Sequence, residues 1–186
     1  MTRKRICAVA AVVIVVAVVF VTFFSLNGNS ADFSHREMRL IVTDSMDGEK
    51  QPYEIETIPK DSVVMIHDLD SSELSQIKVG DVISFRYHVG SATILDCHRV
   101  VEIHYDSEGN VTGFKTHGDN TSSGSYEEPS ADDVTGVVVG VSPLLGKIIR
   151  AVQSNLMFVI MFIIILIVMA SAVIDIVRVR KADRKQ

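Results

Sequence analysis

The 186-residue sequence contains only two cysteines, which leaves little scope for covalent cross-linking. Cys7 lies in a long apolar run near the start of the chain, whereas Cys97 lies in the polar middle part. A disulfide between them would have to join two different environments. We therefore expect the protein to fold without a disulfide.

Metal-binding motifs are absent as well. The sequence has no C-x-x-C or H-E-x-x-H spacing, and its six histidines are scattered singly. We therefore expect neither a structural nor a catalytic zinc, and no other cofactor.

Basic residues are scarce in the middle of the chain. Residues 27–150 contain 21 acidic and 10 basic side chains, a formal charge of −11. Because nucleic-acid binding needs a basic surface, this composition argues against nucleic acid as a partner.

Two long apolar runs flank this acidic middle part. Each has nineteen residues without a charge, Ile6 to Phe24 and Leu156 to Ile174. As helices rising about 1.5 Å per residue, both are long enough to cross a hydrocarbon core of about 30 Å. The first run is too long for the apolar region of a cleavable signal peptide, and no A-x-A-like site follows it. We expect membrane-spanning helices over residues 6–26 and 151–177.

The basic residues at the two ends indicate an orientation. Three of them occupy residues 1–5, and five occupy residues 178–186. By the positive-inside rule, both short termini lie in the cytoplasm and residues 27–150 lie outside it. The sequence therefore predicts a two-span protein of the cell membrane with one extracytoplasmic domain.

The pattern of this domain favours a mainly β fold. Its apolar residues form short runs of period two, rich in β-branched side chains. The predicted strands are Val63–His67, Asp81–His88, Ala92–Asp96, His98–Tyr105, Val111–Thr116 and Gly136–Val141. Asp106–Asn110 has the composition of a hairpin loop. We expect an antiparallel β domain with a linker at Asn27–His35, a helical turn within Ser71–Gly80 and a surface loop at Asn120–Asp132.

Three short segments of the domain carry groups that could perform chemistry. They are Thr43-Asp44-Ser45-Met46, Cys97-His98-Arg99-Val100 and His117-Gly118-Asp119-Asn120. A serine hydroxyl needs a base to remove its proton, and an imidazole can accept that proton and pass it to a leaving amine. A carboxylate can orient the imidazole and stabilise its charged form. The three segments therefore suggest a serine hydrolase.

The same segments resemble those of type I signal peptidases, of the endoplasmic reticulum and archaeal kind that also occurs in some Gram-positive bacteria. Ser45-Met46 resembles the nucleophile box, Cys97–Ile103 the His-Arg-Val box, and Phe114–Asn120 the Gly-Asp-Asn box. Val79–Phe85 and Val134–Ile148 are similar to two further conserved regions of that family. The similarity covers residues 41–148 in the expected order.

The resemblance implies an extracytoplasmic β domain of the signal peptidase kind. It implies a serine endopeptidase with Ser45 as nucleophile, His98 as general base and Asp119 as the third member. The oxyanion donors would be the Ser45 backbone N–H and the Thr43 hydroxyl. The implied partners are the signal peptides of membrane-inserted preproteins and the lipid bilayer, with an association with the translocation machinery left open.

The sequence departs from the family at several points. Gly48 stands where compact members have proline, and the interval between Ser45 and His98 is long. The family often has a second aspartate a few residues beyond the Gly-Asp pair. In this sequence the matching segment is Ser122–Ser125, which contains no aspartate. Asp132 and Asp133 therefore remain alternatives to Asp119.

A lysine base of the bacterial kind is disfavoured. None of Lys50, Lys60, Lys78 and Lys115 precedes an Arg-Val pair, as His98 does. A non-enzymatic alternative also remains, in which a two-span envelope protein binds a partner through its acidic β domain. The two readings differ in one distance, because only a peptidase needs the Ser45 hydroxyl within hydrogen-bond reach of a His98 nitrogen.

Overall fold

The computed structural model describes residues 19–154 and 160–169, together with Val13, Val16, Ala17, Phe158, Ser171 and Ala172. The chain divides into two compact units. One comprises residues 27–147, and the other comprises residues 1–26 with 148–186.

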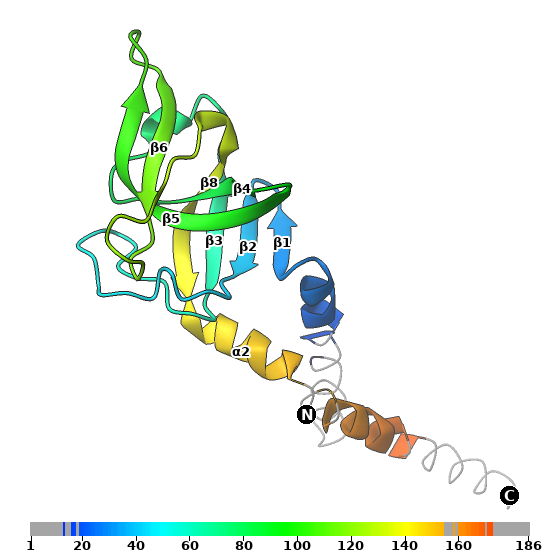
Figure 1. The fold of residues 1–186 in the computed structure, drawn as a ribbon. Coiled ribbons are helices and arrows are strands. Elements are labelled where there is room, and N and C mark those ends of the chain that lie inside the picture. Colours follow the sequence, from blue (N-terminus) through cyan, green and yellow to red (C-terminus); the bar gives the residue numbers. More distant parts are fainter. Residues whose placement is uncertain are drawn as a thin grey trace, which may run out of the picture. The chain divides into compact units, whose positions relative to one another are not determined.

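Residues 27–147 form a mainly antiparallel β fold, as the sequence predicts. One eight-stranded sheet has the order β1-β2-β3-β8-β4-β5-β6-β7, and all its pairings are antiparallel (Figure 1). The strands are β1 (Ser30–Phe33), β2 (Arg36–Leu40), β3 (Val63–Asp68), β4 (Val82–Val89), β5 (Ala92–Tyr105), β6 (Val111–His117), β7 (Tyr126–Glu127) and β8 (Val134–Ser142).

Short helices complete the fold. Two 3-10 turns, η1 (Leu74–Gln76) and η2 (Ala131–Asp133), lie between strands. The helix α2 (Pro143–Gln153) follows β8 directly. Pro143 is favourable at the first helical position, because an N–H there would have no hydrogen-bond partner within the helix. The hydroxyl of Ser142, the preceding residue, accepts the N–H of Leu145 at 3.3 Å.

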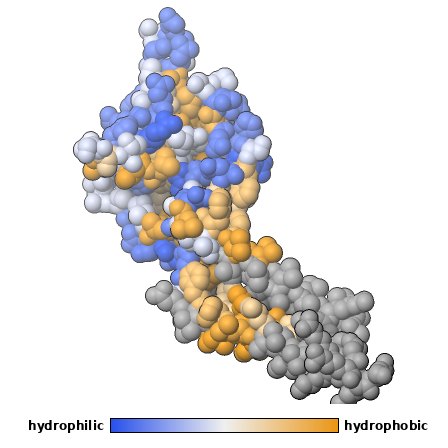
Figure 2. Space-filling model, turned by 90° about the vertical axis from the view of Figure 1, so that its right-hand side faces the viewer, coloured by the Kyte–Doolittle hydropathy of each residue, from blue (hydrophilic) through white to orange (hydrophobic). Residues whose placement is uncertain are grey.

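Apolar side chains pack on both faces of the sheet. Val82 belongs to one buried cluster, with Met46, Ile58 and Val138 among its members. Ile83, the next residue of β4, belongs to another, as alternate side chains of a strand point to opposite faces. The face of the β unit that Figure 2 shows is largely hydrophilic, with hydrophobic patches between.

The predicted central strands are confirmed with small shifts of their ends. Ala92–Asp96 and His98–Tyr105, predicted as two strands, form the single strand β5. The helical turn predicted within Ser71–Gly80 is confirmed as η1.

The predicted linker at Asn27–His35 is wrong, because it contains β1. β1 and β2 are joined through Ser34 and His35, which both have positive φ, and Phe33 pairs with Arg36. Such two-residue turns usually carry Asn-Gly or Asp-Gly, so the sequence Ser34-His35 does not predict a hairpin. The loop predicted at Asn120–Asp132 likewise contains β7.

The two predicted membrane spans, residues 6–26 and 151–177, fall in part on residues outside those described. Within the described part of the chain, no helix has the length and apolarity that crossing a bilayer requires.

Candidate active site

The structure brings Ser45 and His98 together, although 53 positions separate them. The Ser45 hydroxyl lies 3.1 Å from His98 Nε2, within hydrogen-bond distance. This meets the geometric requirement for an imidazole that removes a serine proton.

Ser45 is held by its neighbour in the loop that follows β2. Met46 is almost fully buried in the core. Its carbonyl accepts the N–H of Ile58 and the hydroxyl of Thr57, both at 3.1 Å. The buried side chain and the two hydrogen bonds fix the backbone beside Ser45.

His98 lies in the middle of β5 and is buried. It pairs with Ile83 of β4, and its ring centroid lies 6.3 Å from that of Phe85. The ring is therefore held by the strand and by packing near Phe85, with one nitrogen facing Ser45.

The other nitrogen of His98 contacts Glu127, a residue that the sequence analysis did not select. His98 Nδ1 lies 2.8 Å from Glu127 Oε2. An ionised carboxylate only accepts hydrogen bonds, so the Nδ1–H donates to Glu127 and Nε2 is left as an acceptor for the Ser45 hydroxyl. The Thr116 hydroxyl also donates to Glu127 Oε2, at 3.2 Å.

The strand β7 places Glu127 beside the histidine. Glu127 pairs with Thr116 of β6, and Arg99 of β5 pairs with His117, the next residue of β6. The carboxylate is therefore positioned by a two-residue strand inside the stretch that the composition predicts to be a loop. A glutamate can orient a histidine as an aspartate does, so Glu127 was a candidate by residue type.

Asp119 does not contact His98 in the described structure. Its carboxylate instead receives two hydrogen bonds from Arg99, from Nε at 2.8 Å and Nη2 at 2.6 Å. Both side chains are about 95% buried. Arg99 also donates to the carbonyl of Gly80 at 2.7 Å, and its guanidinium lies 5.2 Å from the ring centroid of Tyr53. The expected place of Asp119 against the imidazole is thus taken by Glu127.

The Gly-Asp-Asn segment holds the Ser45 loop by other contacts. The backbone N–H of Asn120 donates to the Ser45 carbonyl at 2.7 Å, and its side-chain amide donates to the Asp44 carbonyl at 3.1 Å. A Cβ at Gly118 would lie 2.8 Å from the Ser45 carbonyl oxygen and 3.0 Å from His98 Nε2. Only glycine leaves room for this close approach.

Asp132 and Asp133 lie elsewhere. The carbonyl of Asp132 accepts a hydrogen bond from Arg86. The carboxylate of Asp133 contacts Ser130 and His88, and the hydrogen bond from the Ser130 hydroxyl is the main reason that the pKa of Asp133 is lowered. Neither aspartate contacts His98.

Thr43 lies beside the nucleophile candidate. Its hydroxyl is 3.3 Å from the Ser45 hydroxyl. Thr43 and His98 are the side chains that hydrogen-bond Ser45 Oγ in the described part of the chain, and no lysine does so. Of the four candidate lysines, Lys50 pairs with Glu56 and Lys115 lies over the ring of Tyr126.

No protein-family model matches the chain, and no curated protein matches its sequence closely enough to be called a relative. A function has to be inferred from the residues and their geometry.

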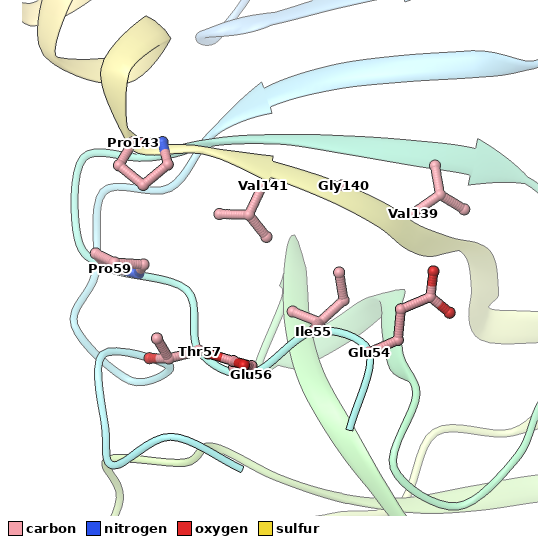
Figure 3. A pocket seen from close by; sticks show the side chains of 9 residues that line it. All are labelled: Glu54, Ile55, Glu56, Thr57, Pro59, Val139, Gly140, Val141 and Pro143. Carbon is pink, nitrogen blue, oxygen red and sulfur yellow. The ribbon is translucent and has the colours of Figure 1, made fainter. Parts of the chain in front are cut away.

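A separate cleft of about 430 Å³ lies between the segment after Ser45 and β8 (Figure 3). Its lining residues are Glu54, Ile55, Glu56, Thr57, Pro59, Val139, Gly140, Val141 and Pro143. In Figure 3 the segment that carries Ile55 faces the strand that carries Val141. Neither Ser45 nor His98 lines this cleft, so it is distinct from the candidate site.

The described residues also contain no group of three His, Cys, Asp or Glu side chains that could hold a metal ion.

Proposed function

We propose that this chain is a membrane-bound serine endopeptidase that removes signal peptides from exported preproteins. The observation that carries the proposal is the linked set of Ser45, His98 and Glu127, with contacts of 3.1 and 2.8 Å on the two sides of one imidazole. A surface module that only binds a partner has no need to bring these three groups together.

The chemistry would follow the general route of serine hydrolases. His98 Nε2 takes the proton of Ser45 as its oxygen attacks the scissile carbonyl carbon. The imidazolium is stabilised by the Glu127 carboxylate and then gives its proton to the leaving amine. Water, deprotonated by the same imidazole, then attacks the acyl carbon, and the imidazolium returns the proton to the Ser45 oxygen as the C–O bond breaks and the new carboxylate is released. No cofactor is needed for any of these steps.

The developing oxyanion needs hydrogen-bond donors. The backbone N–H of Ser45 and the hydroxyl of Thr43 are the candidates, and the Thr43 hydroxyl already lies 3.3 Å from the reacting oxygen. Loss of one such donor in a serine hydrolase typically costs about 2.7 to 4 kcal/mol of transition-state stabilisation.

An unpaired strand edge beside the site offers a way to bind a peptide. β5 pairs with β4 from Ala92 to Arg99, whereas β6 pairs with β5 only from Arg99 onward. The other edge of residues 92–98 is therefore open in the described sheet. An extended peptide could add there as a further strand, by main-chain hydrogen bonds.

Signal peptides are the substrate class that best suits the rest of the chain. The two apolar runs and the basic termini predict a membrane protein with residues 27–150 outside the cytoplasm. The site residues lie in segments that resemble those of signal peptidases, in the same order.

The deciding experiment is cleavage of a preprotein by membranes that contain the wild-type chain or its Ser45→Ala variant, with the cut mapped by mass spectrometry. We expect cleavage at one site by the wild type and nearly none by Ser45→Ala or His98→Ala. His104→Ala is the matched control, because His104 is partly exposed on β5 and its ring nitrogen faces Glu102, at 3.9 Å. Equal cleavage by wild type and Ser45→Ala would contradict the proposal.

A further inference from the structure

We propose that Asp96 selects substrates that carry a Lys or Arg side chain at one of the two positions that follow the scissile bond. This inference rests on the proposed peptidase function, since it concerns the peptide on which Ser45 and His98 would act.

Asp96 lies on the reacting side of the imidazole. Asp96 and His98 are two positions apart on β5, so their side chains share one face of the strand. Asp96 Oδ1 is 3.8 Å from His98 Nε2, the same nitrogen that contacts the Ser45 hydroxyl. Glu127 contacts the opposite nitrogen. The two carboxylates therefore have different surroundings, and only that of Asp96 lies where a substrate would pass.

The Asp96 carboxylate can accept further hydrogen bonds. Oδ1 accepts the backbone N–H of Cys97 at 2.8 Å. Oδ2 has no hydrogen-bond partner within the part of the chain that the structure describes, and the side chain is 30% exposed. An ionised carboxylate can accept about four hydrogen bonds, so it can still receive those of an ammonium or guanidinium group.

The two neighbouring arginines are already paired. Arg39 reaches Cys97 Sγ and Ser84, but its guanidinium is held by the Glu37 carboxylate through contacts at 2.8 and 2.6 Å. Arg99 is bound to Asp119 in the same bidentate manner. Asp96 therefore remains available to take a cation from outside, on the side of His98 Nε2.

The open edge of β5 leads a peptide past this carboxylate. Residues 92–95 are exposed, Asp96 is half-buried, and the strand is buried from Cys97 to Val100. A peptide added along this edge, with its scissile bond at Ser45, places the residues next to that bond near Asp96. A basic side chain there gains a charge-assisted hydrogen bond, and an acidic one is repelled.

The test compares peptides that differ in one residue near the cut. A preprotein-derived peptide with a mapped cut carries Lys, Gln or Glu in turn at each of the two positions that follow the scissile bond. The full chain is used in detergent, as wild type and as Asp96→Asn. The asparagine retains an acceptor for the Cys97 N–H and removes the charge. Asp32→Asn is the control, because Asp32 is exposed on β1, at the far end of the sheet order from β5.

We expect the wild type to cleave the Lys peptide about fivefold faster in kcat/KM than the Gln peptide at one or more positions, and the Glu peptide more slowly. Asp96→Asn should bring the Lys-to-Gln ratio to about one, whereas Asp32→Asn should leave it at the wild-type value. Asp96→Lys should reverse the preference toward Glu.

Two results would overturn the assignment of Asp96. One is a Lys-to-Gln ratio that Asp96→Asn leaves unchanged. The other is an equal loss for all peptides in Asp96→Asn, which would make Asp96 a residue that positions His98. In both cases cleavage by the wild type would still depend on Ser45, so the peptidase proposal would stand. Cleavage that is independent of Ser45 would remove both proposals.

Discussion

At the scale of single residues, Glu127 makes the sharpest prediction. Glu127→Gln keeps the shape of the side chain but removes the charge that stabilises the imidazolium and fixes its Nδ1–H. We expect kcat to fall by roughly 10⁴-fold, as in hydrolases that lose the carboxylate of a triad. The measurement is steady-state cleavage of the mapped preprotein peptide.

Two further variants separate this role from simple loss of structure. Glu127→Asp should recover part of the activity, since it restores the charge at a shorter reach. Glu128→Gln changes the adjacent exposed acid and should cleave as the wild type does. Equal losses in Glu127→Gln and Glu128→Gln would show that the carboxylate on His98 has no special part in the reaction.

Thr43 gives a graded prediction. Thr43→Val removes the hydroxyl that lies 3.3 Å from Ser45 Oγ and keeps the branched shape. We expect kcat to fall by roughly 10- to 100-fold, less than for a principal oxyanion donor, because the Ser45 N–H remains. Thr43→Ser should keep most of the activity in the same assay. Full activity in Thr43→Val would exclude the hydroxyl from oxyanion binding.

Cys97 is a buried free thiol next to His98. Burial raises its pKa from 9.0 to about 11, because the thiolate loses its hydration. The folded state therefore holds the proton more tightly than the unfolded state. The stability gained from the neutral thiol is present below pH 9 and is lost as the pH rises through 11.

This pKa shift predicts slow alkylation of Cys97. At pH 8 the thiol is neutral and buried, and only the thiolate reacts. We expect iodoacetamide to modify Cys97 at least tenfold more slowly in the folded protein than after denaturation, as measured by peptide mass spectrometry, which separates it from Cys7. Equal rates in the two states would mean that the site around Cys97 is open to solvent.

At the scale of secondary-structure elements, the Arg99–Asp119 ion pair joins β5 to the segment that holds the Ser45 loop. Both partners are buried, so removing one leaves an uncompensated charge. We expect Asp119→Asn to lower the free energy of unfolding by about 3 kcal/mol or more. Activity should fall as well, because Gly118 and Asn120 contact Ser45 and its neighbours.

Stability measurements then distinguish this role from that of Ser45. Ser45→Ala should lose activity without a comparable loss of thermal stability in detergent. The double variant Arg99→Met with Asp119→Leu should be more stable than Asp119→Asn, as it leaves no unpaired charge. An unchanged melting temperature in Asp119→Asn would contradict a structural role for the pair.

The sequence predicted the elements unevenly, for physical reasons. β3, β4 and β8 were found because buried central strands show runs of Val, Ile and Phe. β1, β2 and β7 were not predicted, because they are short and carry polar residues that hide the apolar alternation of a strand. Ser45 and His98 were selected from their local motifs. Glu127 was not, because its place depends on the pairing of β6 with β7, which no local pattern reveals.

At the scale of the whole molecule, charge is distributed by segment. Residues 27–150 carry a formal charge of −11, whereas residues 1–5 and 178–186 are rich in basic side chains. The potential that keeps basic loops in the cytoplasm should hold both termini there and leave the acidic domain outside. We predict one crossing for each of the two apolar runs, so the two termini should share one side of the membrane.

This topology can be tested with a thiol reagent that does not cross membranes. Ser107 is exposed in the loop between β5 and β6, and Ala182 lies in the basic tail of the sequence. In a Cys7→Ser background, where buried Cys97 gives little signal, we expect Ser107→Cys to be labelled in intact cells. Ala182→Cys should be labelled only after the membrane is made permeable. Labelling of Ala182→Cys in intact cells would show that the tail lies outside, and the site would then need a different route to its substrates.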